Sequence, residues 1–132
     1  MLEGLVRKYR QFSQRELKRR GIDLSEEQLS VLGEIRKNDG VSQRDIALST
    51  GRDPASITRM LDILEKKKLL KRKTSATDRR SFSIVLTDKG KEVMDKAHPV
   101  MLELREFSLR KMTKSSRSTF IQTINFIEEN LN

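Results

Sequence analysis

Two short segments of this sequence combine guanidinium groups with small hydrogen-bonding side chains. The first is the helical face formed by Ala55, Ser56, Thr58, Arg59, Asp62 and Lys66. Arginine pairs with guanine edges in a major groove, and alanine or threonine methyl groups contact thymine. Most charged helix faces are only solvated, and we favour that interpretation for Asp62 and Lys66 taken singly.

The second segment is the polar stretch 74–80, which contains Asp78, Arg79 and Arg80. Two adjacent guanidiniums at the tip of a hairpin loop can enter a narrow, electronegative minor groove, so we favour DNA contact for both arginines. The Asp78 carboxylate can brace one of them or accept turn N–H groups, and an ordinary turn aspartate is an equally good interpretation.

The residue types present do not suggest a catalytic site or a metal site. Cysteine is absent, which excludes disulfides, thiolate ligands and thiol redox sensing. His98 is the only histidine, and we interpret it as a partly exposed helix residue rather than a ligand. No serine, histidine and acid set suggests nucleophilic catalysis, so we expect no enzyme, no metal and no cofactor.

Composition favours a polyanionic partner. Lys and Arg number 28 against 19 Asp and Glu, for a formal charge of +9, although charge alone does not choose among DNA, RNA and an anionic membrane. The 132 residues suffice for one compact domain. Since we find neither a signal core at residues 1–12 nor an apolar span, we expect a cytoplasmic protein without a membrane partner.

Local signals predict the helices that must position these groups. An amphipathic helix opens the chain and ends near Gly21. A capping box at 25–28 begins a second helix, which stops at the turn 38–40, and Ser42 caps a short helix that ends at Gly51.

Asp53 and Pro54 begin the next helix, because the carboxylate can cap free N–H groups and proline at the first position loses no hydrogen bond. Two helices joined by a tight glycine turn form a helix-turn-helix pattern. The apolar stripe of this helix should face inward, and this context favours DNA contact for Ser56 and Arg59; the stripe is Ile57, Met60, Leu61 and Leu64.

The periodicity then changes to that of a β-hairpin. We predict strands at 69–73 and 81–86, with Phe82, Ile84 and Leu86 on one face. A helix from Thr87 toward Met112 should be kinked or split at Pro99, and a last helix follows Thr113. The predicted fold is mainly α with a small β-hairpin wing, an α+β winged helix-turn-helix.

The two terminal helices carry more apolar residues than a winged core of this size can cover. An obligate helical dimer would bury them, although about half could pack within one chain. The candidates for this dimer interface are Leu2, Leu5, Val6, Tyr9, Phe107, Phe120, Ile124, Ile127 and Leu131.

The order of these pieces resembles the MarR family of winged-helix regulators, in register over about residues 25–91. The matching pieces are Ser25-x-x-Gln28-Leu29-x-Val31-Leu32, Ser42-Gln43-x-Asp45-Ile46-Ala47, Ile57-Thr58-Arg59-Met60-Leu61-Asp62-x-Leu64-Glu65, Asp78-Arg79-Arg80-Ser81 and Leu86-Thr87-Asp88-Lys89-Gly90. No single piece would be sufficient without the others.

The resemblance implies a homodimeric transcription regulator, in most cases a repressor, that binds an inverted repeat in double-stranded DNA. The recognition helix 53–67 would use Ser56, Thr58 and Arg59, and the wing 74–80 would use Arg79 and Arg80. We add Ala55 and Asp78 to these base-reading sets. Candidates for the DNA backbone are Ser42, Gln43, Arg52 and Lys73.

The resemblance also implies a division of the chain and a small effector. Residues 23–87 would form the winged helix-turn-helix, and 1–22 with 88–132 the helical dimerisation region. Small aromatic or amphipathic ligands would act from a cleft between the two regions, for which the sequence marks no residues.

Two departures from the family pattern are visible. The family usually has glycine before the first wing strand, where this chain has Lys68; a left-handed lysine costs about 1 kcal/mol, so we expect the helix to end differently. The N-terminal cysteine of redox-sensing members is absent.

Two other functions also fit the sequence. A nonspecific architectural protein would bind duplex DNA through phosphate contacts alone, with little discrimination between sequences. A winged-helix module that docks acidic proteins would show no salt-sensitive DNA binding.

Overall fold

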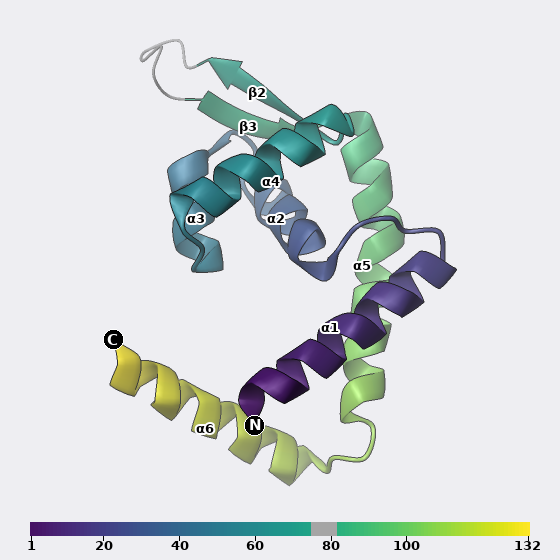
Figure 1. Ribbon diagram of the computed structural model, residues 1–132, viewed down its shortest axis with the longest axis vertical. Coiled ribbons are helices and arrows are strands. Elements are labelled where there is room, and N and C mark those ends of the chain that lie inside the picture. The colour runs from purple at the N-terminus through teal and green to yellow at the C-terminus, as the bar shows by residue number, and fades with distance from the viewer. Residues whose placement is uncertain (75–81) are drawn as a thin grey trace. The chain divides into compact units, whose positions relative to one another are not determined.

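The computed structural model describes residues 1–74 and 82–132, which divide into two compact units, 1–101 and 102–132. The chain is mostly helical with a small antiparallel sheet, which confirms the predicted winged-helix fold class (Figure 1). The helices are α1 (Leu2–Arg19), α2 (Glu26–Lys37), α3 (Gln43–Thr50), α4 (Pro54–Lys66), α5 (Asp88–Leu109) and α6 (Lys114–Leu131). The strands are β1 (Val41–Ser42), β2 (Leu70–Thr74) and β3 (Phe82–Leu86).

The predicted helix starts are confirmed by their capping hydrogen bonds. The Ser25 hydroxyl accepts from the Gln28 N–H, and the Gln28 side chain accepts from the Ser25 N–H, completing the capping box of α2. Ser42 caps α3, and Gly51 ends it in the left-handed conformation, at φ 64°. These bonds satisfy N–H groups that have no partner inside the helix.

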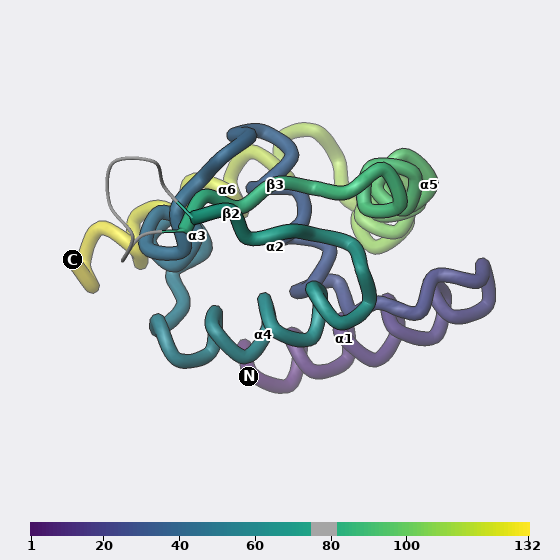
Figure 2. The backbone as a smooth tube through the Cα atoms, turned by 90° about the horizontal axis from the view of Figure 1, so that it is seen from above, coloured from purple at the N-terminus to yellow at the C-terminus, as the bar shows by residue number. Residues whose placement is uncertain are grey.

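The sheet has one strand more than the predicted hairpin. Its order is β1-β3-β2, with β3 paired antiparallel to both neighbours. Two residues are too few to show an alternating pattern, so β1 could not be predicted from the sequence. Figure 2 shows the chain leaving α4, entering β2 and returning through β3 to α5.

The strand face that carries Phe82, Ile84 and Leu86 is buried only in part. Ile84 and Leu86 are buried, whereas Phe82 is 46% exposed. Phe82 pairs with Thr74 in the last register position of the sheet, where it lines a groove beside α3.

The core of the first unit lies where α2, α3, α4 and the sheet meet. Apolar stripes at helical spacing supply it, which leaves the opposite faces of α3 and α4 outside. Its fully buried side chains include Leu29, Leu32, Ile35, Ile46, Ile57, Leu61, Leu64, Leu70 and Ile84.

Helix α4 ends with a lysine in the conformation that glycine usually supplies. Lys68 has φ 60°, so the expectation of a different helix end was wrong. Its N–H donates to the Glu65 carbonyl and the Leu69 N–H donates to the Leu64 carbonyl, the two bonds of a Schellman motif. Leu69, at 3% exposure, is then anchored in the core, which holds Lys68 in place.

Helix α5 runs without a break from Asp88 to Leu109, so the alternative that Pro99 splits it was wrong. The last helix begins as predicted, with the Thr113 hydroxyl accepting from the Ser116 N–H. None of the helices in residues 1–74 and 82–132 has the length and apolar character that crossing a membrane requires.

Candidate nucleic-acid interface

The outward face of α4 presents the residues predicted to read bases. Ile57, Leu61 and Leu64 are fully buried and Met60 is half-buried, which fixes the rotation of the helix about its axis. Ala55, Thr58 and Arg59 are consequently exposed, and Ser56 is half-buried. The face thus combines a methyl group, a hydroxyl and a guanidinium within little more than one turn.

Asp53 organises the beginning of this helix. Its Oδ2 accepts a hydrogen bond from the Ser56 N–H at 3.0 Å, and Pro54 follows at the first helical position. Hydrogen bonding to Ser56 is the main reason that the pKa of the Asp53 carboxyl lies below its ordinary value of 3.8, and the positive charge of Arg59 lowers it further. The end of α4 that carries the reading residues is therefore capped by an ionised group.

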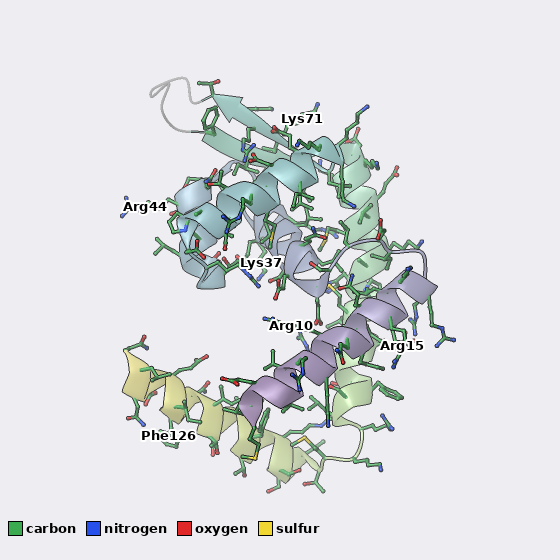
Figure 3. All side chains as sticks on the ribbon, in the orientation of Figure 1. Arg10, Arg15, Lys37, Arg44, Lys71 and Phe126 are labelled. Carbon is green, nitrogen blue, oxygen red and sulfur yellow. The ribbon has the colours of Figure 1, made fainter. Side chains whose placement is uncertain are left out.

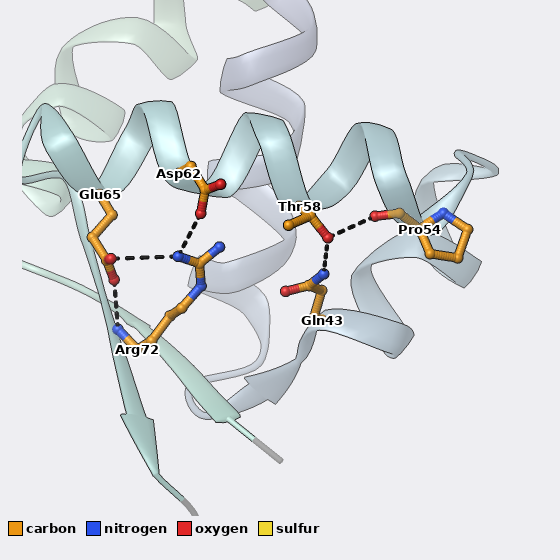
Figure 4. A network of polar contacts seen from close by, with 6 residues as sticks. All are labelled: Gln43, Pro54, Thr58, Asp62, Glu65 and Arg72. Atoms are coloured by element: carbon orange, nitrogen blue, oxygen red, sulfur yellow. Dashed lines mark hydrogen bonds and ion pairs between the residues drawn. The ribbon is translucent and has the colours of Figure 1, made fainter. Parts of the chain in front are cut away.

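Thr58 is connected to both helices of the helix-turn-helix. Its hydroxyl donates to the Pro54 carbonyl at 2.9 Å and accepts from the side-chain amide of Gln43, at the start of α3 (Figure 4). The hydroxyl proton is thus used inside the protein, and the threonine methyl group is the part of the side chain that remains for an apolar contact.

Strand β2 is tied to α4 through Arg72. Its guanidinium lies 2.8 Å from Asp62 Oδ1 and 3.3 Å from Glu65 Oε1, and its backbone N–H donates to Glu65 Oε2 (Figure 4). The Arg72 side chain is only 16% exposed, so this cluster is better shielded than an ordinary surface pair. Asp62 is therefore not simply a solvated residue: it helps to hold the wing strand against the recognition helix.

The residues predicted for backbone contacts lie around α3 and β2. Ser42 uses its hydroxyl as the cap of α3, whereas Lys73 is exposed on β2. Arg52, in the turn between α3 and α4, lies 3.4 Å from Glu27 Oε1, an atom that also pairs with Arg10 at 2.9 Å. Glu27 thus bridges α1 to the turn of the helix-turn-helix.

Two cations on the same elements were missed from the sequence. Arg44 of α3 and Lys71 of β2 are exposed and project outward (Figure 3). Lys71 could have been found as the same-face neighbour of Lys73, because residues two apart share one side of a strand. Arg44 follows the cap residue Ser42 by two positions and carries no distinguishing motif.

A groove of about 820 Å³ runs beside α3. Exposed Leu48 and Phe82 supply apolar surface, and Arg44 and Arg52 supply positive charge. The other lining residues are Ser42, Gln43, Ala47, Gly51 and Pro54. It adjoins the start of α4 and belongs to the same candidate interface.

Three predicted wing residues, Asp78, Arg79 and Arg80, lie outside the described residues. Their contacts with DNA stay a prediction that rests on the sequence. The flanking strands end at Thr74 and begin again at Phe82, which pair with each other across the hairpin.

The predicted dimerisation residues remain accessible within the single chain. Tyr9 is half-buried, and its hydroxyl donates to Glu26 Oε1 at 2.9 Å. The others are exposed: Leu2, Leu5, Val6, Phe107, Phe120, Ile124, Ile127 and Leu131. Ile121 and Phe126, outside the stripe considered from sequence, are also exposed on α6. Figure 3 shows Phe126 on this helix.

Metal-ligand clusters are not found within residues 1–74 and 82–132, where no three His, Cys, Asp or Glu side chains converge. His98 is exposed on α5.

Comparison with known proteins identifies one matching family model and several solved structures that share the fold. Residues 24–82 match the model of the MarR family. The uncharacterized HTH-type transcriptional regulator YhbI of Bacillus subtilis (strain 168) is 37% identical over 75 residues, which are 57% of this chain and 49% of that protein. The chain spans about half the length of the curated relatives it matches.

Two solved structures share the fold over nearly the whole chain. The S. aureus MepR–DNA complex is similar with a TM-score of 0.86 at 22% identity, covering 99% of this chain and 94% of that one. The transcriptional repressor CouR bound to a 23-mer DNA duplex has a TM-score of 0.85 at 26% identity, covering 96% and 89%.

Proposed function

We propose, from the MarR-family domain that this chain carries at residues 24–82, that the protein is a transcription regulator that binds double-stranded DNA in a sequence-specific manner. The observation that carries the proposal is the outward face of α4, where Ala55, Thr58 and Arg59 are exposed while the opposite face is locked in the core. The DNA-bound state of the similar CouR structure supports the same role.

Helix α4 would recognise bases through one charged contact and one apolar contact. Arg59 is suited to donate two hydrogen bonds to a guanine edge in the major groove. Ala55 and the Thr58 methyl group are suited to contact thymine, since the Thr58 hydroxyl is occupied by Pro54 and Gln43. Ser56 lies beside them.

Contacts to the sugar–phosphate backbone would set the orientation of α4. Cations on α3, on the following turn and on β2 surround the reading face: Arg44, Arg52, Lys71 and Lys73. Ser42 and Gln43 begin α3 and would add polar contacts. Such contacts fix register without selecting sequence.

The wing would provide the second reading element. Because Arg72 joins β2 to Asp62 and Glu65, a movement of α4 would be transmitted to the strand that leads into the loop. Arg79 and Arg80 would then enter the minor groove, with Asp78 limiting the freedom of the loop.

A homodimer would place two such heads on one inverted repeat. The exposed apolar residues of α1 and α6 support an interface formed by 1–22 and 88–132, with 23–87 as the DNA-binding part. We propose that the dimer acts in the cytoplasm as a repressor and that a small effector, by altering the spacing of the heads, releases it from its operator.

Selection of bound sequences from a random duplex pool tests this function. We expect an enriched inverted repeat whose half-site centres lie about one helical turn apart, roughly 34–36 Å. Arg59→Ala should then weaken binding to the selected operator more than binding to random duplex, whereas Arg105→Ala, an exposed arginine on α5, should change neither.

The same experiment distinguishes the two alternative functions. Equal losses on operator and random DNA would identify a nonspecific architectural protein. Absence of salt-sensitive binding to any duplex would favour a module that docks acidic proteins.

A further inference from the structure

Gln43 and Thr58 join the first residue of α3 to the second turn of α4, at the edge of the reading face. The Gln43 side-chain amide donates to the Thr58 hydroxyl, which in turn donates to the Pro54 carbonyl (Figure 4). Thr58 is exposed, whereas Gln43 is half-buried. A residue of one helix thus holds the side chain of an outward-facing residue of the other.

Gln43 points toward α4 because of its place on α3. It precedes the buried residues Ile46 and Ala47 by three and four positions, and residues at this spacing share one face of a helix. Helix α3 packs on α2 and α4. The Gln43 amide is therefore carried on the inward face of α3, where the packing of the two helices sets its position.

The Thr58 side chain has one branch that can form hydrogen bonds and one that is apolar. A threonine in a helix is divided between two χ1 rotamers, whereas a valine has one strongly preferred rotamer. The bond from Gln43 favours the rotamer in which the Thr58 hydroxyl faces α3 and the Pro54 carbonyl. A change of rotamer would move the hydroxyl and the methyl group together.

The two branches of Thr58 recognise different features of DNA. A threonine methyl group contacts the C5-methyl group of thymine, whereas a free threonine hydroxyl can bond to several bases. The Thr58 hydroxyl donates its one proton to Pro54 and accepts from Gln43, so it has no donor left for a base. While these bonds hold, Thr58 is restricted to an apolar contact.

We infer that Gln43 is a specificity-determining residue, which makes Thr58 recognise the thymine methyl group without contacting that base itself. The inference rests on the proposed function, because it requires that α4 enters a major groove. Gln43 acts here as a positioning residue, and its second amide N–H remains for the phosphate contact proposed above. Without the bond from Gln43, Thr58 would populate both rotamers and lose its preference for thymine.

Deoxyuridine isolates this contact, because it pairs as thymidine does but lacks the C5-methyl group. Each thymine of the operator enriched from the random pool is replaced by uracil, one position at a time, and Kd is measured at fixed salt. At the position that Thr58 recognises, binding should weaken about fourfold, the effect of one buried methyl group. Thr58→Ser lacks the methyl group, so it should abolish this loss and identify the position.

Gln43→Met keeps the length of the side chain and removes the hydrogen-bond donor. The uracil loss at the Thr58 position should shrink to less than about twofold in this variant, while the losses at other thymines stay unchanged. Gln14→Met, at an exposed glutamine of α1, is the matched control and should keep the full loss.

Thr58→Val separates the positioning of Thr58 from any other effect of Gln43. Valine presents methyl groups without the help of a hydrogen bond, because one rotamer dominates in a helix. Protein that carries Thr58→Val should therefore show the uracil loss, and adding Gln43→Met should leave that loss unchanged. The four proteins form a double-mutant cycle that isolates the coupling between the two residues.

The rotamer of Thr58 can also be measured in the free protein. Three-bond couplings of the Thr58 methyl carbon report its χ1 angle. Gln43→Met should change these couplings from the values of a single rotamer to averaged values. Thr123 on α6, whose hydroxyl also donates to the carbonyl four residues earlier, is the reference and should not respond.

The inference is overturned if no uracil loss depends on Thr58, if Gln43→Met keeps the full loss or weakens all duplexes evenly, if it acts equally in protein that carries Thr58→Val, or if the Thr58 couplings do not change. With an operator selected and Arg59→Ala selective for it, such a result would leave the proposed function standing. If no operator is selected, the proposed function fails, whereas the couplings still decide whether Gln43 sets the rotamer of Thr58.

Discussion

At the scale of a single residue, Asp53 caps α4, and its carboxyl has a pKa that differs between the folded and unfolded chain. Its folded pKa is lower than the unfolded value of 3.8, mainly through the hydrogen bond from Ser56. A lowered carboxyl pKa contributes stability that is fully present above the unfolded value and is lost as the pH falls through the folded value.

We therefore expect the melting temperature of Asp53→Ala to fall below that of the unmodified protein at neutral pH, with the gap narrowing as the pH drops below about 4. Asp53→Asn keeps a capping oxygen without the charge. Its melting temperature should lie between those of the other two proteins at neutral pH. The pH dependence that titration of the Asp53 carboxyl causes should be absent from this variant. A gap of constant size down to pH 3 would contradict this account.

Lys68 stores backbone strain, because a side chain is held at φ 60°. Lys68→Gly should stabilise the protein by about 1 kcal/mol through relief of the left-handed conformation. The midpoint of urea unfolding measures the gain. In the interior of α1, Lys8→Gly should instead destabilise by about 1 kcal/mol, since there glycine only adds freedom to the unfolded chain.

At the scale of elements, α5 is pressed against the chain that leaves α4. A Cβ on Gly90 would lie 2.0 Å from the Leu69 carbonyl oxygen, and neither backbone can withdraw easily, since the Thr87 N–H donates to that same oxygen. The turn at 67–69, the start of β2 and the first turn of α5 thus form one packed junction.

Gly90→Ala should consequently destabilise the protein by about 3 kcal/mol, at the upper end of the usual cost of overpacking. The matched change Gly4→Ala, in α1 where nothing lies within 4 Å, should stabilise by up to about 1 kcal/mol. Chemical denaturation measures both. If the two alanines had the same effect, the close approach at Gly90 would not limit the packing of α5.

At the scale of the whole molecule, α1 and α6 leave several large apolar side chains exposed. Helix α6 buries none of its residues, although its sequence is strongly patterned. A helix of this kind is stable in water only when another surface covers its apolar face.

Sedimentation equilibrium should therefore report a dimer for the unmodified protein. The double change Leu5→Glu with Ile124→Glu should shift it to a monomer, because charges would have to be buried at the proposed interface. Leu48→Glu, at an exposed leucine on α3, should leave the mass unchanged. A monomeric unmodified protein would exclude the dimer from the proposed function.

Much of the winged-helix region could be predicted from sequence because its signals are local. Caps at Ser25, Ser42 and Asp53 act over three residues, and the stripe of α4 follows from its period alone. That stripe also determines which face of α4 points outward, and hence that Arg59 is exposed.

Tertiary structure decided the features that depend on contacts between distant segments. Strand β1 exists because β3 pairs with it, Lys68 is left-handed because Leu69 is anchored in the core, and Asp62 meets Arg72 only when β2 returns alongside α4. A cavity lined by Ile22, Lys67 and Val93 joins three distant segments in the same way. No periodicity or motif in the sequence predicts these contacts between distant segments, because the packing that stabilises them exists only in the folded chain.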